Sequence, residues 1–287
     1  MTVNLGHARR ENISGAPDDV KVFEEERRQR VLDYAENAEF GALSRNWLER
    51  SMAEKYVHNF DWAGLPIIQY PHDVVAFQEL VWRTRPDLII ETGVARGGSL
   101  MLSASLLAML DYCDAVESGA SFDPRASRRA VLGIDIDIRA NNRRAIEGHP
   151  FSHMIKLIEG SSVDEETISA VRNFARPFKR VQVCLDSSHT HDHVLAELEA
   201  YAPLVTPGCY CITFDTFIED MPKGFFVDRP WDVGNSPKTA VIEFLKRLRE
   251  EGRIASDGDC LAFEVDRLME LKLSVTAAPQ GYLRRTE

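Results

Sequence analysis

Residues 91–99 form a glycine-containing segment whose residue types suit the binding of a charged ligand. An apolar run, residues 87–90, precedes the segment, and a longer apolar stretch follows it, so the pattern predicts a strand, a turn and a helix. Glycine allows close approach of backbone to a ligand, and the free N–H groups of a helix N-terminus attract carboxylate or phosphate. We therefore expect a cofactor with a charged tail here. The residues expected to contact it are Glu91, Gly93, Arg96, Gly97 and Ser99.

Two kinds of cofactor compete for this turn. A dinucleotide fingerprint, G-x-G-x-x-G, needs a middle glycine two residues after the first, and the residue two places after Gly93 is Ala95. Glu91, ahead of the first glycine, would repel a pyrophosphate but attract an amino group. S-adenosylmethionine has an amino group, a carboxylate and a ribose diol. The turn therefore favours S-adenosylmethionine, with a dinucleotide as the weaker alternative.

The next two predicted strands supply the remaining cofactor contacts. Asp135 ends an apolar strand, where its carboxylate can accept hydrogen bonds from both ribose hydroxyls, and Asp137 is the alternative for that role. Ser161 and Ser162 follow the third strand and offer small polar groups to an adenine edge. An N-cap of the following helix is an equally open interpretation of these two serines.

Alternating strand and helix patterns predict the fold. We expect strands over residues 87–91, 130–135, 154–159, 180–186, 208–215, 260–265 and 271–275. We expect helices over residues 18–37, 71–85, 99–112, 140–147, 164–175, 191–202 and 237–251, and an irregular aromatic loop over 59–66. The alternation predicts an α/β fold with a doubly wound, mainly parallel, seven-stranded Rossmann-like sheet. Ligands of such sheets bind at the carboxyl ends of the strands.

The domain organisation expected from these patterns has three parts. Residues 1–17 read as a disordered tail, residues 18–85 as an N-terminal helical cap, and residues 86–287 as the cofactor-binding domain. The helix expected over residues 18–37 carries an apolar stripe, which predicts a homo-oligomer.

Composition limits the possible partners and compartment. The 287 residues carry a formal net charge of -11, which argues against a nucleic-acid-binding face. We find no signal peptide, and no apolar run near the roughly 18 residues that a membrane span needs. The five cysteines include no CxxC pair. They read as reduced thiols of a cytoplasmic protein, with a redox or metal role for Cys209 and Cys211 as a remote alternative.

Six motifs resemble the family of cephalosporin hydroxylases and rhamnosyl O-methyltransferases, over about residues 60–285. They lie at residues 60–69, 90–93, 133–137, 186–191, 230–237 and 279–283. The resemblance implies a class I S-adenosylmethionine-dependent methyltransferase. It also implies a small-molecule acceptor, a hydroxyl of a sugar or specialised metabolite, as in antibiotic biosynthesis.

The resemblance also implies a metal site at the ends of the fourth and fifth strands. Asp186 matches the first metal-binding acid of the family, and Asp215 matches an acid at the end of the next strand. Phe214 stands where the family has a further acid, so the expected magnesium site lacks one ligand. A bound divalent cation lowers the pKa of a hydroxyl, and a nearby base then removes the proton.

His189 lies three residues after Asp186, where a general base is expected. Its reference pKa of about 6.5 suits proton abstraction near neutral pH. Three alternatives remain: a structural histidine bonded to backbone, a metal-free base pair of His189 with Asp186, and zinc bound by His189, His191 and His193. Glu219 and Asp220 are candidate replacements for the missing metal ligand, although they read as loop acids.

The long segment of residues 218–236 is expected to contribute to an acceptor pocket or lid. Phe225, Phe226 and Trp231 are its candidate contacts, and packing against the N-terminal helices is the alternative. Three other functions stay open. They are N-methylation without metal, a non-catalytic cofactor-binding partner of another enzyme, and, weakly, iron-dependent hydroxylation.

Overall fold

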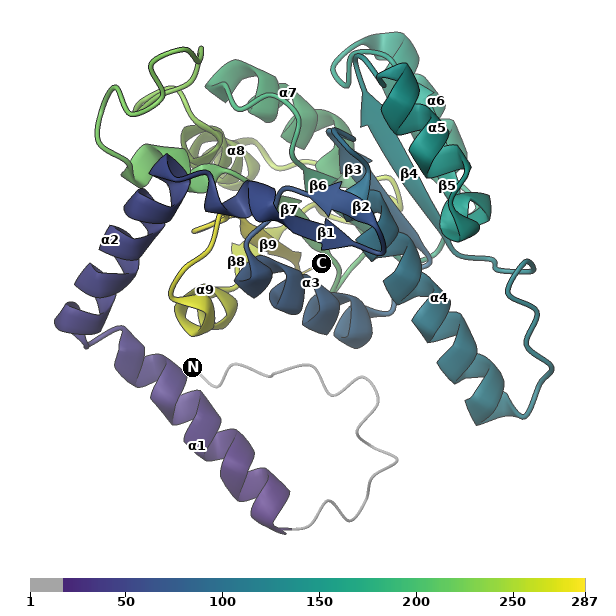
Figure 1. The fold of residues 1–287 in the computed structure, drawn as a ribbon, viewed down its shortest axis with the longest axis horizontal. Helices are drawn as coiled ribbons and strands as arrows, with labels where there is room; N and C mark the ends of the chain where they lie inside the picture. The colour runs from purple at the N-terminus through teal and green to yellow at the C-terminus, as the bar shows by residue number, and fades with distance from the viewer. Residues whose placement is uncertain (1–17, 287) are drawn as a thin grey trace.

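A seven-stranded sheet organises the molecule in the computed structural model, which describes residues 18–286 (Figure 1). The tail expected over residues 1–17 lies outside the described residues. The strands are β3 (Leu88–Thr92), β4 (Ala130–Asp135), β5 (Ile155–Glu159), β6 (Val181–Leu185), β7 (Tyr210–Thr213), β8 (Phe263–Val265) and β9 (Tyr282–Arg285). Their order is β5-β4-β3-β6-β7-β9-β8. The strands from β5 to β7 are parallel, and β9 runs antiparallel to both β7 and β8. The expected doubly wound sheet is confirmed.

The central strands are buried on both faces. Every residue of β3, β6 and β7 is buried, as the continuous apolar runs of parallel strands require. Glu91 pairs in register with Gly133 on one side and Cys184 on the other. The strand ends of β3, β4 and β6 therefore lie at one edge of the sheet. The chain order reverses between β3 and β6, so this edge contains the switch point where such folds bind ligands.

Helices cover both faces of the sheet, and two apolar clusters fill the layers between. One cluster packs α3 (Pro71–Thr84) and α4 (Gly98–Ser118) on the sheet. The other packs α6 (Glu165–Ala175), α7 (His191–Tyr201) and α8 (Pro237–Glu251). The short helix α5 (Ala140–Glu147) follows β4.

Helix α4 is longer and more apolar than the sequence indicated, because it continues past Tyr112 to Ser118. Its length and hydropathy would suffice for a membrane span, contrary to the expectation that no such run exists. Leu100, Met101 and Leu107 in its first part lie in the protein core, whereas Tyr112 and Val116 near its end are exposed.

The N-terminal part differs from the expectation in two places. A second helix, α2 (Ala38–Ala53), follows α1 (Asp18–Tyr34), and the Asn37 side chain accepts a hydrogen bond from the Phe40 N–H where α2 begins. The predicted aromatic loop is an antiparallel hairpin of β1 (Phe60–Trp62) and β2 (Leu65–Ile67). Trp62 Nε1 donates to Ser105 Oγ of α4 at 3.0 Å and so holds the hairpin on the sheet domain.

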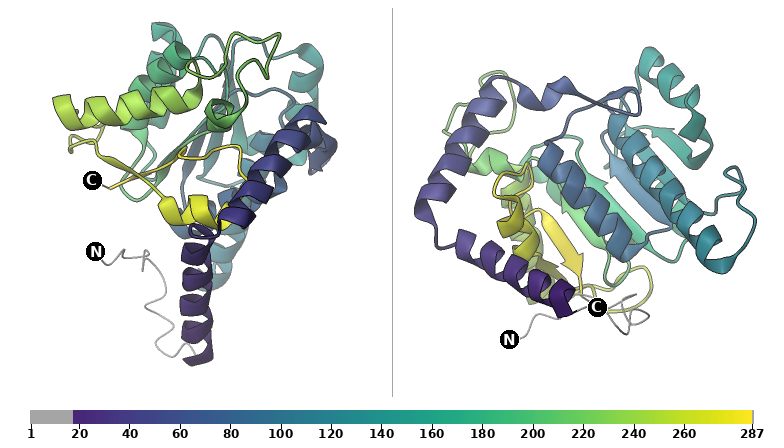
Figure 2. Two further views of the ribbon diagram at one scale, coloured as in Figure 1. Left: turned by 90° about the vertical axis from the view of Figure 1, so that its left-hand side faces the viewer. Right: turned by 60° about the horizontal axis from the view of Figure 1, so that its bottom comes forward.

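Helix α1 projects from the body of the molecule and leaves part of its apolar surface exposed (Figure 2). Val22 and Phe23 are each 56% exposed. Most of the apolar side chains of α1 are exposed, but they are spread around the helix and do not form the single stripe that was expected.

The C-terminal part also differs from the expectation. The strand predicted over residues 271–275 is wrong: this segment ends the helix α9 (Arg267–Leu273). The Asp266 side chain caps α9 by accepting from the Met269 N–H at 3.0 Å, and Met269 and Leu273 are buried one turn apart. The last strand of the sheet is β9, which the sequence analysis did not predict, and β8 begins later than expected.

Asp73 joins the N-terminal helix α3 to the C-terminal segment. It is 1% exposed, and its carboxylate accepts hydrogen bonds from the Ala277 N–H at 2.8 Å, the Tyr282 hydroxyl at 2.6 Å and the Thr276 hydroxyl. Burial raises the pKa of Asp73, although these hydrogen bonds oppose the rise. One carboxylate thus holds together segments from opposite ends of the chain.

We expect Asp73→Ala to lower the free energy of unfolding by about 2–4 kcal/mol, because three buried donors lose their acceptor. Urea denaturation measures the loss. Val75→Ala is the matched control, since Val75 lies on the same helix and is 56% exposed. Equal stability of the two variants would show that Asp73 does not join these segments.

Candidate active site

The turn after β3 lies against the end of β6. Gly93 has φ +88°, and a Cβ there would lie 2.0 Å from the backbone oxygen of Asp186. Gly97 has φ +87°, and its Cβ would collide with the Ile146 side chain at 2.5 Å. Glycine at both positions thus permits close packing of protein on protein. This packing brings the predicted cofactor turn and Asp186 together at the switch point. Arg96 is exposed in the same turn.

Asp135 holds the turn in shape. Its Oδ2 accepts from the Val94 N–H at 2.8 Å and the Ala95 N–H at 3.2 Å, and its Oδ1 accepts from the Asp137 N–H. Asn142, which the sequence analysis missed, donates to the Ala95 carbonyl at 2.6 Å. The Asp137 side chain is exposed beside this arrangement.

The two serines after β5 do not cap a helix, because the N-cap of α6 is Asp164. Ser162 is buried and its Oγ lies 3.1 Å from His193 Nε2. Ser161 is partly exposed next to it. The N-cap interpretation is therefore wrong. Both serines follow the end of β5, at the edge of the sheet where the cofactor is expected.

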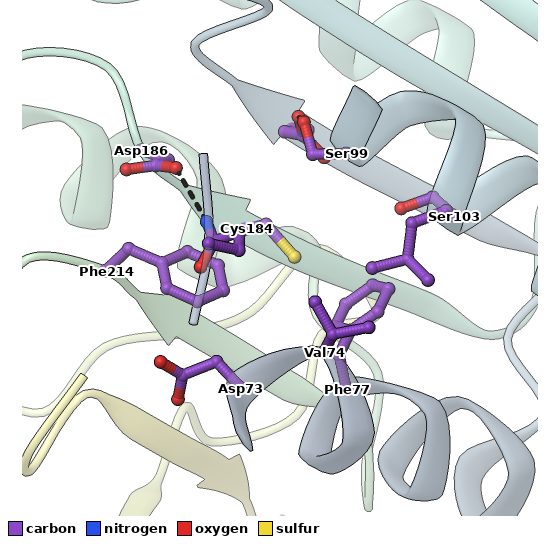
Figure 3. A pocket seen from close by; sticks show the side chains of 11 residues that line it. Asp73, Val74, Phe77, Ser99, Ser103, Cys184, Asp186 and Phe214 are labelled. Carbon is purple, nitrogen blue, oxygen red and sulfur yellow. Dashed lines mark hydrogen bonds between the residues drawn. The ribbon is translucent and has the colours of Figure 1, made fainter. Parts of the chain in front are cut away.

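Glu91 lines a cavity between α3, α4 and the strand ends, shown in Figure 3. It is 4% exposed, and Ser99 donates a hydrogen bond to its Oε1. Burial raises the pKa of Glu91 to about 7, and the Ser99 hydrogen bond opposes this rise. Ser99, Asp186 and Phe214 line the same cavity.

Asp186, His189 and Asp215 form a cluster at the ends of β6 and β7. One potential ligand atom of each lies within 4.8 Å of the others. His189 Nε2 is 3.1 Å from Asp215 Oδ2. Burial raises the pKa of Asp186 and of Asp215; Asp215 further raises that of Asp186, and His189 lowers that of Asp215. The ion-pair partner of His189 is thus Asp215, and Asp186 lies in the same cluster.

Gln69 and His58 reach this cluster from the N-terminal part, and the sequence analysis assigned neither a role. Gln69 Nε2 donates to Asp186 Oδ2 at 3.0 Å, the bond drawn as a dashed line in Figure 3. His58 lowers the pKa of Asp215 through its charge. The motif at residues 60–69 contained Gln69, but only the fold shows which carboxylate it contacts.

The candidate replacements for the missing metal ligand are engaged elsewhere. Glu219 Oε2 accepts from the Gly234 N–H at 2.9 Å and from Ser236 Oγ at 2.7 Å. Asp220 pairs with Lys238. Phe214 is 8% exposed and lines the cavity beside Asp186. Glu219 and Asp220 lie in the 3-10 helix η5 (Thr216–Asp220) instead of a loop, and their side chains bond away from the Asp186 cluster.

The three histidines that follow Asp186 point to different partners. His191 Nδ1 lies 2.9 Å from Thr239 Oγ1, whereas His193 Nε2 lies near Ser162, Ser187 and the buried Glu197. Only His189 belongs to a potential metal-binding group among the described residues. The prediction of a zinc site shared by His189, His191 and His193 is therefore wrong. An iron site built from two of these histidines is wrong for the same reason.

The segment before α8 covers His189. The rings of Trp231 and His189 meet edge to face at 4.6 Å. Asn235 Oδ1 accepts from the His191 N–H at 2.9 Å, and Ser236 forms a capping box with Thr239 where α8 begins. Trp231 therefore packs against the candidate base, and the segment is fixed to the starts of two helices.

The raised pKa of Glu91 predicts a pH-dependent stability. Below about pH 4.5 the carboxyl group is protonated in both states. Between about pH 4.5 and pH 7 only the unfolded state loses the proton, so stability falls as pH rises. Relative to Glu91→Gln, the natural protein should lose about 3 kcal/mol of unfolding free energy across this window.

Urea denaturation at several pH values measures this difference. The Glu91 charge also raises the pKa of Asp186 and of Cys184, so the difference between the two proteins includes the effect of Glu91 on these neighbours. Glu166→Gln, at an exposed position on α6, is the control and should follow the natural protein. If the unfolding free energies of the natural protein and of Glu91→Gln change with pH in parallel, the pKa of Glu91 is not raised by burial.

Known proteins share this fold and sequence pattern. A "Rhamnosyl O-methyltransferase" of Mycobacterium tuberculosis H37Rv is 26% identical over 216 residues, covering 74% of this chain and 73% of that protein. One of Mycobacterium leprae is 25% identical over 225 residues, covering 78% and 82%. A solved structure of CmcI with Mg and SAM aligns with TM-score 0.51 and 19% identity, covering 80% of this chain and 78% of that chain. Residues 54–286 match the Rhamnosyl O-methyltransferase/CmcI family, and the chain belongs to that family.

Proposed function

We propose that the protein is an S-adenosylmethionine-dependent O-methyltransferase acting on a hydroxyl of a sugar or specialised metabolite. The observation that carries the proposal is the cluster of Asp186, His189 and Asp215 beside the β3 turn. A base and two carboxylates next to a cofactor turn provide what methyl transfer to a hydroxyl needs. Family membership and the names of the mycobacterial relatives support the same reaction class.

The cofactor would lie along the strand ends from β6 to β5. Glu91, Gly93, Arg96, Gly97 and Ser99 would surround its amino-acid end. Asp135 shapes the turn through backbone N–H groups, so the exposed Asp137 has more free acceptor capacity for the ribose hydroxyls. Ser161 and Ser162 would lie at the adenine.

The donor set fits a divalent cation held by Asp186 and Asp215. Both acids are partly buried, desolvation raises both pKa values, and the Asp215 charge further raises that of Asp186, so a cation between them would favour their ionised forms. Oxygen ligands and waters suit magnesium, and Phe214 leaves fewer protein ligands than three acids would. A bound cation would lower the pKa of the acceptor hydroxyl.

His189 would accept the hydroxyl proton. A carboxylate accepts hydrogen bonds and cannot donate, so the contact with Asp215 places a hydrogen on His189 Nε2 and leaves a lone pair on Nδ1. The cofactor would supply the methyl group, and His189 would receive the proton that the acceptor hydroxyl loses. Asp215 would stabilise the resulting imidazolium, and the Trp231 ring would limit access of water.

We expect His189→Ala to reduce turnover by about 10²–10⁴-fold, the usual contribution of a general base. Affinity for S-adenosylhomocysteine should stay unchanged, because His189 does not belong to the cofactor turn. A rhamnosylated glycoside serves as acceptor probe for turnover, and calorimetry measures the affinity. His191→Ala is the matched control, since its ring bonds to Thr239. Undiminished turnover of His189→Ala would remove its role as base.

Calorimetric titration with Mg²⁺ or Mn²⁺ tests the metal site. Asp186→Asn and Asp215→Asn should each weaken binding, whereas Asp220→Asn should not, because Asp220 pairs with Lys238. Phe214→Glu should strengthen binding by adding a carboxylate beside Asp186. Full methyl transfer after chelation, with no metal binding by the natural protein, would overturn the metal and favour metal-free O- or N-methylation.

A further inference from the structure

Gln69 carries a buried hydrogen-bond acceptor without a partner. The side chain is 9% exposed, and its Nε2 donates to Asp186 while its Oε1 contacts no donor within the described part of the chain. A buried carbonyl oxygen without a hydrogen-bond donor destabilises the folded state. Such a cost at the edge of a binding site indicates that a ligand supplies the missing donor.

Most of the polar side chains that line the cavity beside Gln69 are hydrogen-bond acceptors. The carboxylates of Glu91 and Asp186 line it together with Gln69. Ser103, 1% exposed, adds a second buried oxygen without a partner. Asp73 also lines the cavity, but three hydrogen bonds from the C-terminal segment occupy its carboxylate. Besides the Ser103 hydroxyl, which can donate or accept, three groups that accept only therefore face one space: the free oxygen of Gln69 and the carboxylates of Glu91 and Asp186.

The size and charge of this space select the group that fits. It has room for about one water-sized group, so it takes the end of a ligand rather than a whole one. An ammonium group has three donors and no acceptor, which matches three acceptors, whereas a water has only two donors. A positive charge also offsets the repulsion between two buried carboxylates.

We propose that Gln69, together with Glu91 and Asp186, binds the α-ammonium group of the cofactor's amino-acid tail. The inference rests on the proposed function, since it takes S-adenosylmethionine as the cofactor. Gln69 then connects the two halves of the site: its carbonyl contacts the cofactor, and its amide hydrogen orients Asp186. Gln69 is thus a binding residue for the cofactor and a positioning residue for Asp186.

Binding of three ligands to Gln69→Met tests the proposal by calorimetry. S-Adenosylhomocysteine has the full tail, its decarboxylated analogue keeps the amine alone, and methylthioadenosine has neither group. The substitution keeps the side-chain length and removes the acceptor. Both amine-bearing ligands should bind about 10–100-fold more weakly, the loss expected for a hydrogen bond to a charged group. Affinity for methylthioadenosine should not change.

Gln182→Met is the matched control. Gln182 is 0% exposed, and its Nε2 also has no partner among the described residues. It lies near the start of β6, at the opposite end of the strand from Asp186. The control should bind all three ligands as the natural protein does. Thermal unfolding of both variants shows that each is folded.

The other outcomes overturn distinct statements. Equal weakening of all three ligands by Gln69→Met would assign Gln69 a general structural role, and no weakening would remove it from the site. Loss of affinity for methylthioadenosine alone would place Gln69 at the nucleoside. If the natural protein binds none of the three ligands, the proposed cofactor itself is wrong, which is a separate failure.

Discussion

The close approach of the β3 turn to the end of β6 is the constraint on which the site depends. At Gly93 the two backbones come so near that any side chain would collide with the Asp186 carbonyl. The same approach places Glu91 and Asp186 on one cavity. A cofactor held by the turn therefore lies next to the residues that would act on the acceptor. Glycine at position 93 is thus required by the packing of the turn on the end of β6.

The same arrangement gathers buried negative charge. Asp186, Asp215 and Glu91 all have raised pKa values because burial disfavours their charged forms. Arginine and lysine are absent from the residues that line the cavity, so the described protein provides His189 and His58 as its nearby compensating groups. Cationic ligands would compensate the negative charge of these carboxylates. A sulfonium, an ammonium and a divalent cation each have a place in such a site, and their arrival would favour the ionised carboxylates.

The sequence predicted the parts of this arrangement that depend on local patterns. Apolar runs ending in Glu91, Asp135 and Asp186 indicated strands, and the parallel sheet then required their ends to meet. It did not predict α9, because residues 271–275 alternate like a strand while the cap at Asp266 starts a helix before them. It also missed β9, whose antiparallel pairing with β7 and β8 is a long-range contact.

Side-chain partners within the site were the hardest to predict, since they depend on segments far apart in the chain. His189 was expected near Asp186 three residues away, yet it pairs with Asp215 because β6 and β7 are neighbours. Gln69 lies 117 positions before its partner Asp186. The hairpin of β1 and β2 is fixed to α4 through Trp62 and ends two residues before Gln69, so it sets the position of Gln69.

The N-terminal segment is consequently part of the site. Gln69 contacts Asp186, His58 acts on Asp215, and Asp73 ties α3 to the segment that leads into β9. Phe214, which follows β7, offers no ligand atom to a cation, whereas Gln69 holds Asp186, which follows β6, through a hydrogen bond. The geometry of Asp186 thus depends less on a cation than it would if the cation were its main partner.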